Sequence, residues 1–358
     1  MIRPTLAAAL AVTALAVTAA LPAAAAGRTP PPRCSGHPGI HRLDLSVAGQ
    51  PDYGFYALPT GTPKGIVVFA HGHGHNAADW QEHLLQTAAR DGVIAVAMNY
   101  HGEDVAKRYG WRVREGAADS VAAAQALSAR CPAARTIVMY GVSMGGNTAG
   151  LAAAVPARRA TGAALFDYLF LIEPVTNVTE TYNEAQAVAP TGNATAAKAV
   201  KEIEQEMGGP MTDPAVAPTY LAESDVTRAA DIKAAGIKGA VLVHDIDDGQ
   251  AGYNQSQEMT LALLAQGIPT DMFNVTTKQP GNRDDDTWLD KDVTGVVPGY
   301  DDPFVGHGSE TSNSQLNITT GFDRLAALFA TGETPHCRQF LVDGRSGALA
   351  PPTTAPGC

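Results

Sequence analysis

The sequence predicts a protein of the α/β class. It indicates a mostly parallel, doubly wound sheet with an N-terminal antiparallel hairpin and a helical insertion above the sheet. Three observations point to this class. Short, almost continuous apolar runs recur along the chain, helix-like segments separate most of them, and one separation is much longer than the rest. Such runs suit strands buried on both faces of a parallel sheet, and their alternation with helices is typical of doubly wound folds.

The individual elements follow from these patterns. HRLDLSV and YGFYAL alternate apolar with polar residues around the turn-like AGQPD, which predicts the antiparallel hairpin. The buried strands are expected at residues 65–70, 93–98, 136–141, 167–172, 238–243 and 270–275. Helices are expected at residues 77–90, 114–130, 255–267 and 321–332.

The chain has 358 residues, enough for one large core with an inserted subdomain. We expect one domain over residues 40–340, preceded by a flexible start at 27–39 and followed by a tail at 341–358. The long separation covers residues 174–237, and a structureless loop of that length is unusual in a compact domain. We therefore predict a mostly helical, cap-like insertion there.

Residues 1–26 have the layout of a secretory signal peptide: Arg3, a long Ala/Leu/Val stretch, and the small residues Ala24, Ala25 and Ala26 at the end. We therefore expect a secreted protein, and the abundance of Ala and Gly is typical of a bacterial source. Export fits the four cysteines, since none forms a C-x-x-C pair. Four cysteines allow three pairings, among which we favour Cys34–Cys131 and Cys337–Cys358.

The formal net charge of −11, without a basic run, argues against nucleic acid or an anionic membrane as the partner. No stable membrane span is expected once the signal peptide is removed. The sequence does not fix the oligomeric state, for which a monomer is favoured.

The strongest motif is Gly141-Val142-Ser143-Met144-Gly145, a G-x-S-x-G between an apolar strand and the small-residue segment NTAGLAAA. This is the context of a nucleophile elbow, where a serine on a sharp strand-to-helix turn presents its hydroxyl above the sheet. The N–H of Met144 then becomes one donor to an oxyanion.

With this motif the chain resembles the α/β-hydrolase superfamily, and GVSMGG resembles the elbow of its secreted esterases and lipases. The resemblance extends from about residue 40 to residue 333. It implies an α/β-hydrolase fold and a serine, acid and histidine triad in that chain order.

The histidine-rich run VVFAHGHGHNAADW matches the loop that supplies the second oxyanion donor in that family. The resemblance implies that the backbone N–H of His73 is this donor and that His71 is structural. A metal site formed by His71, His73 and His75 is the alternative, but no H-E-x-x-H or matching carboxylate spacing accompanies them. We expect no metal and no cofactor.

The acid is expected after a late strand. GAVLVHDIDDGQAG resembles the family pattern in which a strand ends in His-Gly and the acid follows that histidine by four residues, which points to Asp248. Here Asp245 replaces the usual glycine, so Asp247 and Asp245 are weaker alternatives. Glu173 is a further alternative, because some family members place the acid at the end of the preceding strand.

The base is expected on a loop between the last strand and the final helix. His307 lies there, whereas His336 follows the helix and comes too late in the chain. The connection that holds His307 is long and contains an acidic cluster at residues 284–292. A solvated loop is the favoured reading of this cluster, with a calcium site as the alternative.

The sequence therefore predicts a secreted serine hydrolase that cleaves small-molecule or polymeric carboxylic esters through an acyl-enzyme on Ser143. One alternative is a peptidase or amidase similar to the prolyl oligopeptidase group. The other is a non-catalytic or metal-binding protein on a hydrolase scaffold.

Overall fold

The computed structural model describes residues 34–36, 39–102, 110–246, 248–276, 307, 316–344 and 346–355. All of them belong to the unit Pro32–Cys358. The predicted signal peptide, the acidic cluster at 284–292 and the alternative acid Asp247 lie outside the described residues.

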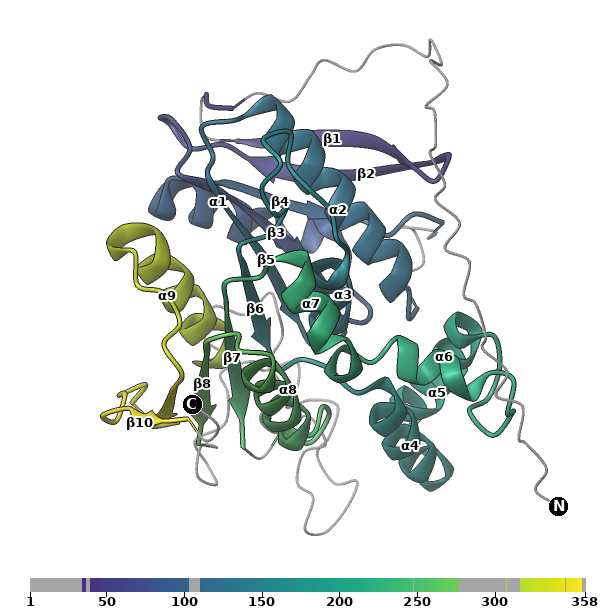
Figure 1. Cartoon of the computed structure of the whole chain (residues 1–358). Coiled ribbons are helices and arrows are strands. Elements are labelled where there is room, and N and C mark those ends of the chain that lie inside the picture. The colour runs from purple at the N-terminus through teal and green to yellow at the C-terminus, as the bar shows by residue number, and fades with distance from the viewer. Residues whose placement is uncertain are drawn as a thin grey trace, which may run out of the picture. The chain divides into compact units, whose positions relative to one another are not determined.

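Within the described residues, the strands form one sheet of ten (Figure 1). They are β1 (Ile40–Val47), β2 (Gln50–Ala57), β3 (Gly65–Ala70), β4 (Ile94–Met98), β5 (Thr136–Val142), β6 (Tyr168–Ile172), β7 (Gly239–Asp245), β8 (Thr270–Val275), β9 (Arg338–Val342) and β10 (Thr353–Thr354). Their order in the sheet is β1-β2-β4-β3-β5-β6-β7-β8-β9-β10. From β4 to β9 every neighbouring pair is parallel, whereas β1, β2 and β10 pair antiparallel. The predicted fold class, with its N-terminal hairpin, is confirmed.

Helices cover both faces of this sheet. The helices are α1 (Gln81–Asp91), α2 (Val113–Arg130), α3 (Met144–Ala154), α4 (Val178–Val188), α5 (Ala194–Met207), α6 (Ala217–Ala222), α7 (Ala229–Ala235), α8 (Tyr253–Ala265) and α9 (Leu316–Thr331). One apolar cluster joins α2, α3, α7 and α8 to one face, and a second joins α1 and α9 to the other. All residues of β3, β4, β7 and β8 are buried, as strands covered on both sides must be.

The segment between β6 and β7 is helical, as the sequence predicts for residues 174–237. It contains α4, α5, α6 and α7, together with short 3-10 turns at Ala189–Thr191 and Asp225–Arg228. A third such turn, Ala77–Trp80, leads into α1 and is capped by the Asn76 side chain. Helix α5 reaches the loop after β3, because the Glu202 side chain bonds His73. The insertion therefore lies against the loop that follows the first parallel strand.

Strands β9 and β10 were not predicted from the sequence. Strand β9 crosses the boundary placed at residue 340, and it adds to the parallel part of the sheet beside β8. Only Phe340 and Val342 of its five residues are buried. Two buried positions in a five-residue segment are too weak a pattern to distinguish a strand from a loop, and β9 is recognisable only through its pairing with β8.

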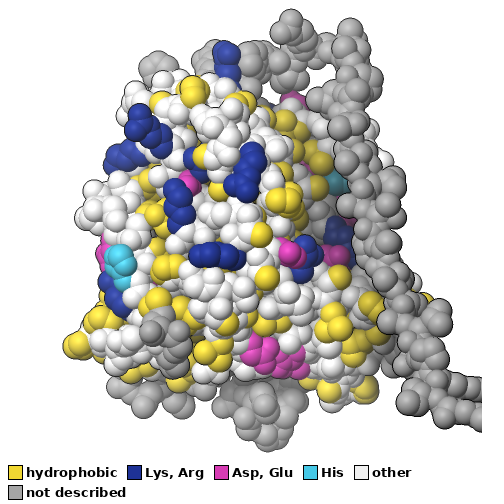
Figure 2. Space-filling view, viewed as in Figure 1, with side chains coloured by type: hydrophobic (Ala, Val, Ile, Leu, Met, Phe, Trp, Pro, Cys, Tyr) yellow, Lys and Arg dark blue, Asp and Glu magenta, His cyan; other side chains and the backbone are white. Residues whose placement is uncertain are grey.

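The surface face shown in Figure 2 is mixed in character. Basic and acidic side chains are interspersed there with apolar and uncharged side chains. None of the helices in the described parts of the chain is both long and apolar enough to span a bilayer.

The predicted disulfide between Cys34 and Cys131 is confirmed. It joins residues 97 positions apart and ties the start of the domain to Cys131, the residue that follows α2. Cys337 is also disulfide-bonded, while its predicted partner Cys358 lies outside the described residues.

We predict that replacing Cys34 and Cys131 together by alanine lowers the free energy of unfolding by about 2–4 kcal/mol. The bond closes a long loop, so its loss restores conformational freedom to the unfolded chain. Urea unfolding of the oxidised variant and wild-type protein measures this difference. Equal midpoints and slopes would contradict it.

Candidate active site

Ser143 stands at a sharp turn between β5 and α3. Its backbone adopts φ 57° and ψ −126°, a conformation that costs energy for a residue with a side chain. Hydrogen bonds hold the turn: the Ser143 N–H donates to the Ile172 oxygen over 3.0 Å, and the Gly146 N–H donates to the Ser143 oxygen over 2.8 Å. The serine is therefore fixed at the carboxyl end of the central strand, as the elbow motif predicts.

The two glycines of the motif are required by close packing. A Cβ atom on Gly141 would lie 2.0 Å from the Gly145 oxygen, and one on Gly145 would lie 2.1 Å from the Ala70 oxygen. The second contact joins the elbow to the end of β3. The motif is thus a steric condition for bringing the serine beside the loop that follows β3.

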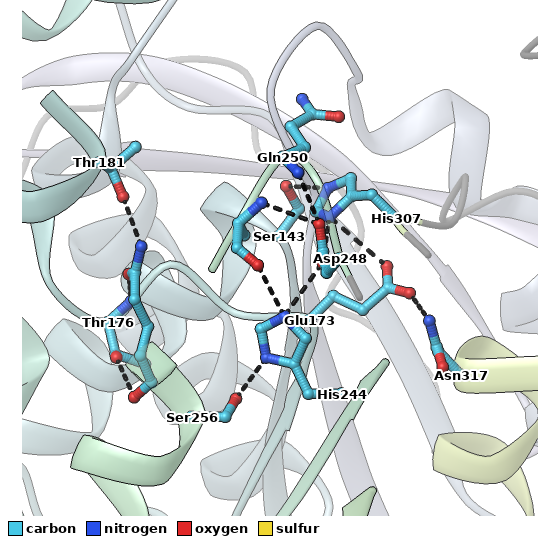
Figure 3. A network of polar contacts seen from close by, with 12 residues as sticks. Ser143, Glu173, Thr176, Thr181, His244, Asp248, Gln250, Ser256, His307 and Asn317 are labelled. Atoms are coloured by element: carbon cyan, nitrogen blue, oxygen red, sulfur yellow. Dashed lines mark hydrogen bonds and ion pairs between the residues drawn. The ribbon is translucent and has the colours of Figure 1, made fainter. Parts of the chain in front are cut away.

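His307 connects the serine to an acid (Figure 3). Its Nε2 lies 2.9 Å from Ser143 Oγ, and its Nδ1 lies 2.8 Å from Asp248 Oδ2. With Nδ1 donating to the carboxylate, Nε2 carries a lone pair that can accept the serine proton. The structure thus brings together the three residues that the sequence nominated as nucleophile, base and acid.

Asp248 is buried, yet its surroundings favour the charged form. Its Oδ1 accepts hydrogen bonds from the backbone N–H groups of Gln250 at 2.8 Å and Ala251 at 2.9 Å. Burial alone would raise the pKa of this carboxyl, but His307 and His244 together hold the pKa well below its usual value. Asp248 is therefore an ionised partner for the His307 ring.

His244 makes a hydrogen bond to the acid, a role that the sequence did not indicate. Its Nε2 faces two acceptors, Asp248 Oδ2 at 3.0 Å and the Ala251 oxygen at 2.8 Å, so this nitrogen carries a proton. Its Nδ1 lies 2.7 Å from Ser256 Oγ on α8. A fully buried imidazole therefore donates to the acid. The signal available in the sequence was its position at the end of a strand, four residues before Asp248.

The other nominated acids have different places. Asp245 is the last residue of β7, and its backbone oxygen accepts the Asp248 N–H at 3.3 Å. Glu173 follows β6 and is completely buried, with its Oε2 4.0 Å from His307 Nδ1. Asp248 thus makes the hydrogen bond to the base, and Glu173 is a second carboxylate near the same nitrogen.

The loop after β3 lies beside the elbow. The His71 oxygen contacts Gly145, since a Cβ atom there would be 2.8 Å away. A turn from Gly72 to His75 is closed by a backbone hydrogen bond of 3.3 Å, and Gly74 in it has φ 80°. His73, the nominated oxyanion donor, lies in this turn, and Met144 is the first residue of α3. The N–H groups at the start of a helix have no partner within the helix.

The alternate histidines have separate partners. His71 is buried against the Tyr100 ring at 3.9 Å, His73 bonds Glu202, and His75 lies 3.4 Å from Asp79. Across the described ranges, no group of three or more His, Cys, Asp or Glu side chains could hold a metal ion. Each imidazole instead makes its own local contact.

We predict that Gly145→Ala lowers the free energy of unfolding by about 3 kcal/mol or more, because its methyl group meets backbone rather than a movable side chain. Gly61→Ala is the matched control, since no atom of the described residues lies within 4 Å of the added atom. Thermal and urea unfolding of both variants measure the effect. Similar small losses in the two would show that the elbow tolerates a side chain.

We predict that His71 makes stability depend on pH. Burial lowers the pKa of His71 to about 3, and its Nδ1 donates to the Gly72 oxygen over 3.1 Å. Within the described parts of the chain, its Nε2 has no hydrogen-bond partner. The unfolded chain binds a proton below about pH 6.5, whereas the folded chain does so only near pH 3. The contribution of neutral His71 to the free energy of unfolding is therefore complete above pH 6.5 and falls as the pH drops towards 3.

The comparison is with His71→Asn, which retains a neutral donor. Between pH 6.5 and 4, wild-type protein should lose stability relative to this variant by about 1.4 kcal/mol per pH unit. Urea unfolding at a series of pH values measures the difference. A difference that does not change with pH would contradict the prediction.

Similar proteins agree with this fold. Residues 61–236 match the family model described as serine aminopeptidase, S33. No curated protein matches the sequence. The acylaminoacyl peptidase of Pyrococcus horikoshii has a TM-score of 0.54 and 15% identity, over 84% of this chain and 42% of that chain. The puromycin-hydrolyzing peptidase of Mycobacterium tuberculosis has a TM-score of 0.52 and 15% identity, over 83% of this chain and 40% of that one.

An esterase of Pyrobaculum calidifontis matches along more of its own length. It has a TM-score of 0.56 and 15% identity, over 82% of this chain and 85% of that chain. The present chain thus spans about two fifths of the two peptidases but most of the esterase. The sheet order, the elbow and these structures together show that the chain has the α/β-hydrolase fold, and its residues 61–236 match the model of a serine hydrolase family with this fold.

Proposed function

We propose that this protein is a serine hydrolase that cleaves carboxylic esters through an acyl-enzyme. The observation that carries the proposal is the continuous path from Ser143 Oγ to His307 at 2.9 Å and on to Asp248 at 2.8 Å. A serine on a sharp turn, a histidine bonded to its hydroxyl and a buried acid bonded to that histidine are the groups that acyl transfer through a serine requires.

The proposed reaction follows from this geometry. Ser143 Oγ attacks the acyl carbonyl while His307 Nε2 accepts its proton. His307 then donates that proton to the leaving group, and Asp248 stabilises the charged imidazole meanwhile. The backbone N–H groups of Met144 and His73 are proposed to hold the oxyanion. A water molecule, activated by the same histidine, then attacks the acyl-enzyme, which releases the carboxylic acid product and restores the Ser143 hydroxyl.

Peptide or amide bonds are a second candidate substrate class. The matching family model is that of a serine aminopeptidase, and two of the similar structures are peptidases. The esterase, by contrast, matches over most of its own length. The triad serves both reactions, so we take small-molecule or polymeric esters as the first class to test and peptides as the second.

Export is part of the same proposal. A disulfide whose Cys131 end is buried supports folding in an oxidising compartment, where such bonds form and persist. This agrees with the signal peptide proposed for residues 1–26. Release of a mature chain beginning at Gly27, found by N-terminal sequencing of the exported protein, is the test.

We predict that the chain from Gly27 hydrolyses a short-chain aryl ester and that Ser143→Ala lowers kcat/KM at least about a thousandfold, because the nucleophile is lost. A melting temperature close to that of wild type shows that the variant is folded. Equal activity in both proteins would assign hydrolysis to another site. An aminoacyl anilide assayed in parallel separates the classes: faster turnover of the anilide would replace the ester proposal with a peptidase.

A further inference from the structure

A second buried carboxylate lies beside His307. Glu173 has no exposed surface, and its Oε2 lies 4.0 Å from His307 Nδ1, the nitrogen that donates to Asp248. Its other oxygen accepts a hydrogen bond from the Asn317 side chain on α9. In Figure 3 the Glu173 side chain extends between Asn317 and His307. A carboxylate is costly to bury, so its place beside the base calls for an explanation.

The backbone holds Glu173 in this position at some cost. Its φ of 47° is unusual for a residue with a side chain. The Glu173 N–H donates to the Val243 oxygen over 2.8 Å, and two residues later the Val175 N–H donates to the Ser143 oxygen over 3.0 Å. The peptide units around Glu173 are thus bonded both to the strand that leads to Asp248 and to the nucleophile itself.

We propose that Glu173 is a positioning residue of the active site: a second carboxylate that, with Asp248, orients His307 and stabilises its charged form. The inference rests on the proposed function, because it concerns the base of that reaction. Glu173 does not touch the reacting atoms, and it acts only through the imidazole. Asp248 supplies the hydrogen bond, and Glu173 supplies a negative charge from the turn that follows β6.

The charges around His307 come from several elements. Among the described residues, Asp248 and Glu173 face the ring directly, His244 acts through its bond to Asp248, and Glu184 on α4 is close enough to interact with Asp248. An opposite charge about 4 Å from an imidazole favours its protonated form. Glu173 therefore raises the pH at which His307 becomes a free base.

The first test is the pH dependence of kcat/KM for Ser143-dependent ester hydrolysis. In Glu173→Gln, which has the same shape but no charge, the acidic limb should move to lower pH by about one unit. Glu173→Asp, which retains the charge, should keep its limb closer to that of wild type. An acidic limb in Glu173→Gln that coincides with the wild-type limb would overturn the proposal.

Asp167→Asn is the matched control. Asp167 is a buried acid just before the other end of β6, where it pairs with Arg159 and Lys238. Its replacement should lower the melting temperature without moving the acidic limb. If Glu173→Gln does not fold, Asn317→Ala serves instead, since it removes a side chain that donates a hydrogen bond to Glu173. It should move the limb in the same direction but less far, and an unmoved limb would again reject the role.

The second test combines substitutions. Asp248→Asn should retain part of its activity because the imidazole still has Glu173 beside it, and adding Glu173→Gln should lower kcat/KM at least about tenfold further than the product of the single effects predicts. If the loss of kcat/KM in the double variant equals the product of the two single losses, Glu173 does not orient or stabilise His307 together with Asp248. If wild type and Ser143→Ala were equally active, the proposed function itself would fail, whereas an unmoved limb in a Ser143-dependent enzyme rejects only the role of Glu173.

Discussion

A carboxylate withdrawn from water is costly to keep as an ion unless charged or hydrogen-bonding groups surround it, and this condition shapes the active site. Asp248 meets it with two backbone N–H groups and two imidazoles. The tight loop from Asp248 to Ala251 supplies the first pair, and His244 and His307 supply the second. The loop after β7, the start of α8 and the position of the base are thus all consequences of keeping one charge buried.

The same edge of the sheet carries backbone strain. Ser143 and Glu173 follow neighbouring strands, and both have positive φ values. Hydrogen bonds across β5, β6 and β7 continue up to these residues, so the sheet offsets the cost of two unfavourable conformations. The two unfavourable backbone conformations lie at the ends of adjacent strands, and the side chains of Ser143 and Glu173 both lie near His307. The rigid parallel core is therefore a requirement for the chemistry as well as for stability.

Local features explain what the sequence could predict. The elbow depends on glycines two residues from Ser143, and the strands on continuous apolar runs, so both were visible without neighbours. His307 followed from chain order, and Asp248 from a resemblance around His244. The resemblance offered Glu173 only as an alternative to Asp248, and it did not indicate that both carboxylates lie beside His307, because these residues come together only through the sheet order. Likewise, β9 became recognisable as a strand only through its pairing with β8.

The choice between esters and amides cannot reside in the triad, because the same acyl-enzyme chemistry serves both. It must come from groups that contact the acyl and leaving groups. The insertion between β6 and β7 is placed for this, since Glu202 on α5 bonds His73 in the turn that holds the proposed oxyanion donor. Changes in α5 can therefore alter substrate acceptance and the position of that turn together. We therefore propose that this insertion selects the substrate, and its residues were not recognisable in the sequence because no close backbone packing like that at Gly141 and Gly145 marks them.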